Sequence, residues 1–182
     1  MSIIIFDTET TGLPSPIIKG LDSQPHIVEF AAIKLDGNTL EEIDRIQFLV
    51  KPPISMPIEV VKIHGITDAK LEHENPFSFY YQPLVDFFIG TEIIIAHNVA
   101  FDICMLKFEL QRLGRITQFP WPPIHICTVN QTIKMLNYRL TLMQLYEHLF
   151  KRPFVDAHRA MNDVGALTSI VRELVKRELL KV

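Results

Sequence analysis

Hydrophobic and polar positions along the 182-residue chain follow two repeats, one typical of strands and one typical of helices. Three runs rich in β-branched residues, Ile3–Phe6, His26–Leu35 and Ile43–Val50, predict strands in the N-terminal part. The turn signal Asp36-Gly37-Asn38 separates the second run from the third. Consecutive strands with short connections of this kind predict an antiparallel meander.

From Glu92 onward the pattern alternates between buried strands and helices. Ile93–Ala96 and Ile124–Thr128 predict two further short strands. Apolar residues recur at helical spacing in six segments, which are Glu59–Ile63, Pro76–Ile89, Val99–Leu113, Val129–Leu136, Leu140–Phe150 and Asp156–Leu180. Pro83 is awkward in the second of these because an interior proline removes a helical hydrogen bond. The order of elements predicts an α/β fold, a mixed sheet covered by helices, as a single domain over residues 1–182.

Composition and charge narrow the class of protein. Hydrophobic residues make up 48% of the chain and charged residues 21%, which favours a compact globular protein over a disordered one. A net charge of −3 argues against a broad basic surface, so we expect any nucleic-acid contact to be small, local or metal-mediated. The sequence shows no signal peptide, membrane span or cysteine motif, which predicts a soluble cytoplasmic protein with no membrane partner.

Two acids follow the first predicted strand directly. If the strand continues for two residues, its alternation places Asp7 and Glu9 on the same face. Neighbouring carboxylates repel each other unless a cation or a proton neutralises them. Hard oxygen ligands of this kind suit Mg²⁺ or Mn²⁺. The ordinary alternative is an exposed acidic strand end.

Three further residues extend this acidic set. Asp102 lies in the first turn of the helix after Ile93–Ala96, at a strand end where α/β sites gather. His158 and Asp163 are five residues apart, about 140° around a helix, so they would flank an ion cluster from two sides. Each has an ordinary alternative as a helix-end or solvated residue. Jointly they supply what two-metal phosphodiester hydrolysis needs, several acids around the ions and a base for the attacking water.

The residues around these acids resemble a known family. The matching segments are Phe6-Asp7-Thr8-Glu9-Thr10-Thr11-Gly12-Leu13, Ile63-His64-Gly65-Ile66-Thr67-Asp68, Ala96-His97-Asn98-Val99-Ala100-Phe101-Asp102 and His158-Arg159-Ala160-Met161-Asn162-Asp163. In order and spacing they resemble the motifs of the DEDDh exonucleases, which include the proofreading ε subunit of bacterial DNA polymerase III, exonuclease X and RNase T. The resemblance spans residues 1 to 175. It implies an RNase H-like fold, with a five-stranded mixed sheet flanked by helices, and a 3′→5′ exonuclease that uses two divalent metal ions, Mg²⁺ or Mn²⁺.

The resemblance also implies roles for individual residues. Asp7, Glu9 and Asp163 would bind the metal beneath the scissile phosphate, Asp102 would help to hold the second ion, and His158 would accept a proton from the attacking water. The residues expected beside the terminal nucleotide are Thr10, Gly12, Leu13, Glu59, His64 and Phe101. Plain core packing is the alternative for Phe101, and anchoring of a loop is the alternative for Leu13.

The choice of polymer depends on weaker signals. Many relatives carry an Asp before the Thr at position 128, whereas this chain has Ile126-Cys127-Thr128, a form similar to that of exonuclease X-like proteins. This form favours DNA 3′ ends over RNA as the partner. The alternative is an exoribonuclease similar to RNase T or oligoribonuclease, since the acids and the histidine do not distinguish the two polymers.

Other partners and functions remain open from the sequence. A DNA polymerase and a second copy of the chain are both left open as partners. A phosphatase of the haloacid dehalogenase type is disfavoured because no glycine-rich segment follows Asp7. A non-catalytic nucleic-acid-binding domain is disfavoured because none of the five catalytic positions is altered. Arg159, Lys107 and Arg112 are candidates for phosphate contacts, with an ordinary surface role as the alternative.

Overall fold

The computed structural model describes residues 1–16, 20–155 and 157–182. Its centre is a five-stranded sheet with the strand order β3-β2-β1-β4-β5. The strands are β1 (Ser2–Thr10), β2 (Ile27–Asp36), β3 (Glu42–Leu49), β4 (Ile93–Ala96) and β5 (Ile124–Cys127). β1, β2 and β3 pair antiparallel, whereas β4 pairs parallel with both β1 and β5. The predicted mixed sheet of five strands, with its antiparallel meander, is therefore confirmed.

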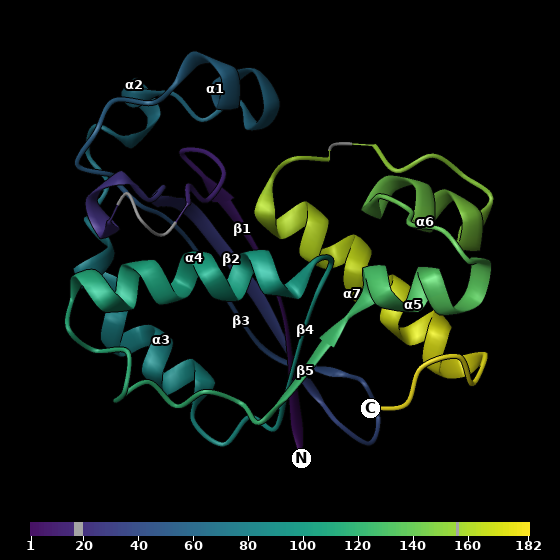
Figure 1. The fold of residues 1–182 in the computed structure, drawn as a ribbon. Coiled ribbons are helices and arrows are strands. Elements are labelled where there is room, and N and C mark those ends of the chain that lie inside the picture. Colours follow the sequence, from purple (N-terminus) through teal and green to yellow (C-terminus); the bar gives the residue numbers. More distant parts are fainter. Residues whose placement is uncertain (17–19, 156) are drawn as a thin grey trace.

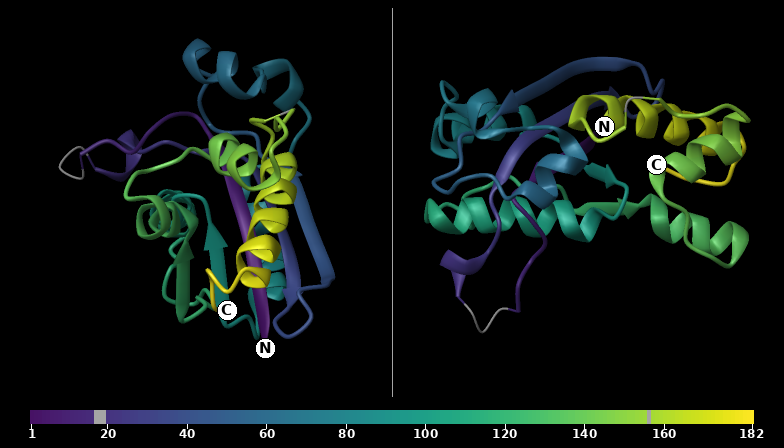
Figure 2. Two further views of the ribbon diagram at one scale, coloured as in Figure 1. Left: turned by 90° about the vertical axis from the view of Figure 1, so that its right-hand side faces the viewer. Right: turned by 90° about the horizontal axis from the view of Figure 1, so that it is seen from above.

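Helices cover both faces of this sheet. The longer ones are α3 (Tyr81–Phe88), α4 (Val99–Arg112), α5 (Thr128–Leu136), α6 (Leu142–Phe150) and α7 (Ala160–Lys176). Short helices occur at α1 (Ile58–His64), α2 (Asp68–Leu71), η2 (Leu21–Ser23) and η3 (Phe77–Tyr80). α4 crosses one face of the sheet, while α7 lies along the other (Figures 1 and 2). α1 and α2 lie beyond the tip of β1, and the two chain ends lie at the opposite end of that strand (Figure 1).

The central strand β1 belongs to both cores. Ile4 and Phe6 pack into the cluster formed with α3 and α4, whereas Ile3 and Ile5 pack into the cluster formed with α6 and α7. All four side chains are completely buried, which explains why the strand is a continuous apolar run. Each such side chain contributes about 1.5–3 kcal/mol by leaving water. The position of β1, and of the residues that follow, is therefore firmly fixed.

β1 continues beyond the apolar run and carries the first two acids. It was predicted over Ile3–Phe6, but it extends to Thr10 because β2 continues to pair with it, with Asp7 opposite Ala31 and Glu9 opposite Glu29. The condition for placing Asp7 and Glu9 on one face is thus met.

The last helix is shorter than predicted. α7 begins at Ala160 instead of residue 156, which lies outside the described residues, and it ends at Lys176 instead of Leu180. His158 has a φ of 67°, in the left-handed region that a right-handed helix does not accommodate. The helix therefore starts after His158, and the prediction that His158 and Asp163 share one helix was wrong.

Pro83 does not break the second predicted helix. η3 precedes α3, and α3 itself begins at Tyr81, so Pro83 lies in the first turn of α3. Backbone N–H groups in a first turn have no partner within the helix, so the missing N–H of proline costs little there. None of the helices in the described part of the chain combines the length and apolar character of a membrane span.

Candidate active site

Three of the predicted acids meet at the tip of β1. Asp7 and Glu9 extend from β1, and Asp163 lies in the first turn of α7. One carboxylate oxygen from each of the three lies within 4.8 Å of the others. The packing of α7 over β1 and β2 brings Asp163 to this position. The structure thus unites residues from opposite ends of the sequence.

Asp102 reaches the same region from the other face of the sheet. It lies in the first turn of α4 and is 2% exposed. Its Oδ1 accepts hydrogen bonds from the backbone N–H and the hydroxyl of Thr8, at 3.1 and 2.8 Å. Because Thr8 stands between Asp7 and Glu9 on β1, these bonds fix α4 directly to the acid-bearing strand.

Burial raises the pKa of all four acids. Burial raises the pKa of Asp7 well above its usual value, and the charges of Asp102, Asp163 and Glu9 raise it further. The pKa of Glu9 rises to about 8 through burial and then through the charges of Asp163 and Glu29. Burial also raises the pKa of Asp102 to about 7 and that of Asp163 to about 6. The cluster therefore retains protons at neutral pH unless a cation compensates its charge.

The cluster fits a hard divalent cation. Within the described part of the chain, no hydrogen-bond donor reaches Oδ1 of Asp163, although this atom is buried. An unpaired buried carboxylate oxygen is costly in a dry site. With oxygens of Asp7 and Glu9 within 4.8 Å, the donors are all carboxylates, which Mg²⁺ and Mn²⁺ prefer.

His158 lies at the rim of the acid cluster. Its side chain is exposed, and its backbone N–H donates to Oδ2 of Asp163 at 3.2 Å. One oxygen of Asp163 therefore holds the turn before α7, while the other faces the acids. The turn places residue 158 beside the cluster and leaves its side chain exposed.

The predicted turn after β1 is compact. The hydroxyl of Thr10 donates to the carbonyl oxygen of Gly12 at 2.8 Å. The next side chain, Leu13, is 80% exposed, so it does not anchor the loop in the core. An apolar side chain this exposed beside the acids is available to a ligand.

His64 links α1 to the end of β1. It is 5% exposed, and its Nδ1 accepts a hydrogen bond from the backbone N–H of Ile66 at 3.0 Å. Its Nε2 faces the carbonyl oxygen of Thr10 at 3.4 Å, so the proton of the neutral ring lies on Nε2. Burial lowers the pKa of His64. Glu59 is exposed on α1, and the half-buried Phe101, in the first turn of α4, packs against the core.

Two of the three cations proposed for phosphate contacts are already paired. Arg112 donates to Oε1 of Glu109 at 3.0 Å and to the carbonyl oxygens of Leu21, Gln24 and Pro25. Arg112 is 17% exposed and holds the loop before β2, so neither of its two expected roles, a phosphate contact or a solvated surface residue, fits. Arg159 forms an ion pair with Glu29. Lys107 is exposed, with its ammonium 5.7 Å from the ring centroid of Trp121.

Glu29 is a buried acid that the sequence analysis did not identify. It lies on β2 opposite Glu9 and is completely buried. Burial raises its pKa, but hydrogen bonds from Arg159, Gln47 and the backbone N–H of Ala160 outweigh burial and lower the pKa below the usual value. A lone acid inside the apolar run of β2 was the signal that could have revealed it.

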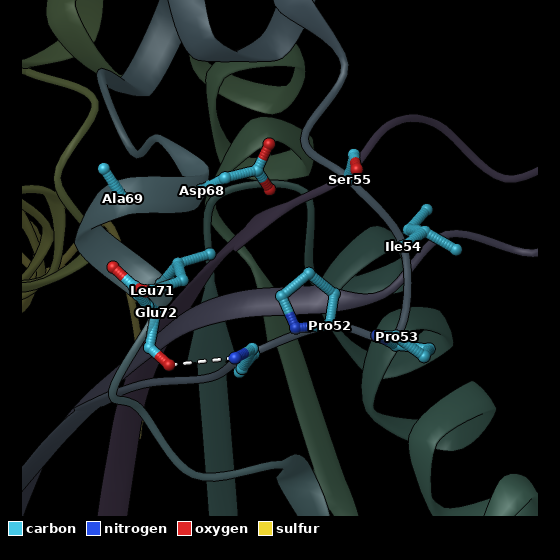
Figure 3. Close-up of a pocket in the computed structure, with 9 residues that line it drawn as sticks. Pro52, Pro53, Ile54, Ser55, Asp68, Ala69, Leu71 and Glu72 are labelled. Carbon is cyan, nitrogen blue, oxygen red and sulfur yellow. Dashed lines mark hydrogen bonds between the residues drawn. The ribbon is translucent and has the colours of Figure 1, made fainter.

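A cavity of about 490 Å³ lies between the segment 51–55 and α2 (Figure 3). Pro52, Asp68 and Leu71 are among its lining residues, all of which differ from the predicted site residues. The ammonium of Lys51 donates to the carbonyl oxygen of Glu72 at 2.9 Å and closes one side. The acid cluster is thus a separate feature.

The sequence matches a family model described as Exonuclease over residues 4–171. The chain therefore belongs to the exonuclease family, and its four acids and histidine follow the order of the DEDDh 3′→5′ exonucleases. Among curated relatives, it is 27% identical to the DNA polymerase III PolC-type of Clostridium perfringens over 96% of its own length and 11% of that protein. It is 30% identical to the DNA polymerase III subunit epsilon of Haemophilus influenzae over 72% of its own length and 48% of the subunit. The chain thus spans less than half the length of these two relatives.

Solved structures show the same fold. The nuclease domain of 3′hExo, a DEDDh family member, bound to rAMP, matches with a TM-score of 0.75 and 18% identity, covering 97% of this chain and 92% of that one. Exonuclease X in complex with 5′ overhanging duplex DNA matches with a TM-score of 0.65 and 22% identity, covering 98% and 95%. The predicted fold of the DEDDh exonucleases is therefore confirmed.

Proposed function

We propose that this domain hydrolyses phosphodiester bonds at the 3′ end of DNA and releases nucleoside 5′-monophosphates. The observation that carries the proposal is the convergence of Asp7, Glu9 and Asp163, with Asp102 beside them and His158 at the rim. Single-stranded DNA is the expected substrate, in proofreading, repair or DNA turnover. The ε and PolC-type relatives, with the exonuclease X-like segment Ile126-Cys127-Thr128, support DNA over RNA.

The four acids hold two metal ions in this proposal. Asp7, Glu9 and Asp163 would hold the ion beneath the scissile phosphate, and Asp102 would help to hold the second. Two bound divalent cations, Mg²⁺ or Mn²⁺, would supply Lewis-acid stabilisation of the charge that develops on the phosphate. Thr8 restricts Asp102 by occupying one of its oxygens.

His158 would act as the general base. Its side chain is exposed and its backbone is bonded to Asp163, which supports a position from which the imidazole would accept a proton from the attacking water. The hydrogen bond from its backbone to Asp163 keeps the base and a metal ligand in one turn. The proton then leaves to solvent from the exposed ring, so the base is restored for the next cycle.

The terminal nucleotide would lie against the turn after β1. Thr10 and Gly12 form a compact backbone turn, Leu13 offers an exposed apolar side chain, and Phe101 lies at the start of α4. Glu59 and His64 of α1 would lie near its 3′ end. Backbone and apolar contacts tolerate any base, which suits a nuclease that is not sequence-specific.

The proposal extends to the partners and the location of the protein. The PolC-type and ε relatives bear the name of DNA polymerase III, which supports a DNA polymerase as a partner of this chain. A homodimer remains a second prediction. The two free cysteines, Cys104 and Cys127, support a reducing cytoplasm.

The decisive test uses 5′-end-labelled single-stranded DNA and RNA of matched sequence, with Mg²⁺ or Mn²⁺. A ladder that shortens from the 3′ end, with mononucleotide products, is expected on DNA. The variant Asp7→Ala, purified in parallel, controls for contaminating nucleases. Faster degradation of RNA would instead support the exoribonuclease alternative, which the resemblance to 3′hExo bound to rAMP favours. Internal fragments, or cleavage that persists in EDTA, would contradict both.

A further inference from the structure

The carboxylate of Glu29 forms a junction between the sheet and the start of α7. Oε2 accepts hydrogen bonds from Nε of Arg159 and from the backbone N–H of Ala160, both at 3.1 Å. Oε1 accepts from Nη2 of Arg159 at 3.0 Å and from Gln47 on β3 at 2.9 Å. The guanidinium is therefore held at two points, a geometry that fixes its orientation.

The segment that Glu29 holds carries two site residues. Arg159 and Ala160 lie directly between His158 and Asp163. The carbonyl oxygen of Arg159 accepts from the backbone N–H of Asp163 at 3.0 Å, and the N–H of His158 donates to the Asp163 side chain at 3.2 Å. Every residue from 158 to 160 is thus connected either to Glu29 or to Asp163.

Among the described residues, Glu29 is the side chain outside α7 that accepts hydrogen bonds from this turn. His158 has a left-handed backbone, and its side chain is exposed. The N-cap of α7 is Arg159, which makes no side-chain cap hydrogen bond, so Glu29 supplies an acceptor to the first helical N–H instead. The side chain of Glu29 is completely buried, whereas the side chain of Arg159 is 42% exposed.

We propose that Glu29 and Arg159 form a positioning pair that sets where α7 begins and so holds the His158 imidazole and the Asp163 carboxylate in register with Asp7 and Glu9. The inference rests on the proposed function and deepens it. In this proposal the pair acts through the turn and not on the reacting atoms. The neighbour of Glu29 across the strands is Glu9. Glu29 therefore borders the acid cluster and also holds the start of α7.

The pair has a matched control elsewhere in the chain. Arg112 and Glu109 form a second Arg–Glu pair, with an Nη1–Oε1 distance of 3.0 Å, and Glu109 is 5% exposed. That pair holds the loop before β2 and has no contact with residues 158–163 among those described. Arg159→Lys and Arg112→Lys both replace a planar guanidinium, which donates from several N–H groups, by a single ammonium. The two substitutions are therefore chemically alike, but only the first lies beside the acid cluster.

The experiment measures kcat and KM on single-stranded DNA, Mn²⁺ affinity by calorimetry, and the thermal midpoint. Glu29→Gln and Arg159→Lys should lower kcat on the order of 10²-fold, because a misplaced turn displaces the base. Both should weaken Mn²⁺ binding through Asp163, with little change in KM. Arg112→Lys should lower the thermal midpoint while kcat and Mn²⁺ affinity stay at the wild-type values.

Two outcomes would overturn the positioning role. One is a lowered thermal midpoint for Arg159→Lys with wild-type kcat and Mn²⁺ affinity, measured well below that midpoint. The other is an additive loss in kcat when Glu29→Gln and Arg159→Lys are combined. If the two residues act as one unit, the double variant should lose no more activity than either single variant. If Glu29→Gln does not fold, Arg159→Lys tests the same pair from its exposed side. Inactive wild-type protein would refute the proposed function, while Mn²⁺ affinity would still test the pair.

Discussion

Thr8 donates two hydrogen bonds to a single oxygen of Asp102, one from its backbone N–H at 3.1 Å and one from its hydroxyl at 2.8 Å. Both residues are buried. The side chain of Thr8 faces α4, while those of its neighbours Asp7 and Glu9 face the cluster with Asp163. One strand therefore presents two acids directly and controls a third through the residue between them.

This contact predicts the effect of Thr8→Val. Valine has nearly the same shape but no hydroxyl, so Asp102 keeps one of the two bonds. We expect a loss of about 1 kcal/mol in the free energy of unfolding, measured in urea. We also expect a lower kcat, because the Asp102 carboxylate gains rotational freedom. Thr8→Ser retains the hydroxyl and should stay near wild type; equal losses in both variants would point to packing instead.

The raised pKa values predict how stability depends on pH without metal. The pKa is raised to about 8 for Glu9, about 7 for Asp102 and about 6 for Asp163, so between about pH 4 and 8 the folded state binds more protons than the unfolded state. Stability in EDTA should therefore fall as pH rises through this range. The lowered pKa of Glu29 acts in the opposite direction. Its contribution to stability is fully present once the pH exceeds the ordinary pKa of a glutamate, so it adds no slope above that pH.

The measurement is the thermal midpoint from pH 5 to pH 8, in EDTA and in Mn²⁺. The decline should be steep in EDTA and largely absent in Mn²⁺, since a bound cation replaces the protons. A midpoint in EDTA that rises with pH over this window would contradict the raised pKa values of the acid cluster.

Repulsion also predicts that Asp7→Asn separates stability from activity. The amide keeps the shape of the side chain but removes one charge from the cluster. At pH 8 in EDTA, its thermal midpoint should lie above that of the wild type, because the remaining acids ionise at less cost. Activity should be lost, and Mn²⁺ should raise the midpoint less than in the wild type. Asp22→Asn, at an exposed acid of η2, is the control and should change neither quantity.

His158→Asn tests the general base without disturbing the backbone. Asparagine tolerates the left-handed conformation at this position, where φ is 67°, better than alanine does. We expect kcat to fall by about 10²–10⁴-fold, the usual loss for a missing base. Mn²⁺ affinity should persist because Asp163 keeps its bond from the backbone of residue 158. Wild-type turnover at neutral pH would exclude His158 as the base.

The paired arginines predict weak dependence of DNA binding on salt. Arg112 and Arg159 are engaged by Glu109 and Glu29, and the net charge is −3, so few cations remain for phosphates. If one or two phosphates are contacted, log affinity should fall by about 0.7–1.4 per tenfold increase in salt. A fluorescent oligonucleotide titrated in Ca²⁺, which suppresses cleavage, gives this slope. A much steeper slope would indicate an extended basic groove and favour a binding role.

Much of the fold and site follows from local patterns. The apolar run before Asp7 defined β1, strand alternation placed Asp7 and Glu9 on one face, and the start of α4 after Ile93–Ala96 placed Asp102 in a first turn. These predictions succeed because the determining forces act between neighbours in sequence. The apolar run stops at Phe6, but β1 continues to Thr10 because β2 pairs with it beyond that run.

The features that were missed depend on distant contacts. The start of α7 is set by Glu29, 131 positions away from Ala160, and no local pattern contains that bond. Helical periodicity predicts that Arg112 is exposed, but the loop before β2 folds over its guanidinium. In the sequence Glu29 stands out only as a lone acid within an apolar run, and this pattern does not say which residues it joins. Such residues are recognised only when the elements that they join have been placed.

The arrangement of α7 has a consequence for the chain as it is being synthesised. A ribosome that has extruded residues up to β5 has delivered Asp7, Glu9 and Asp102, but neither His158 nor Asp163. At that stage the sheet face around Ile3 and Ile5 also lacks the helix that buries it. α7 thus completes the acid cluster and covers that surface in one step, so a chain truncated before α7 lacks Asp163 and leaves an apolar sheet face uncovered.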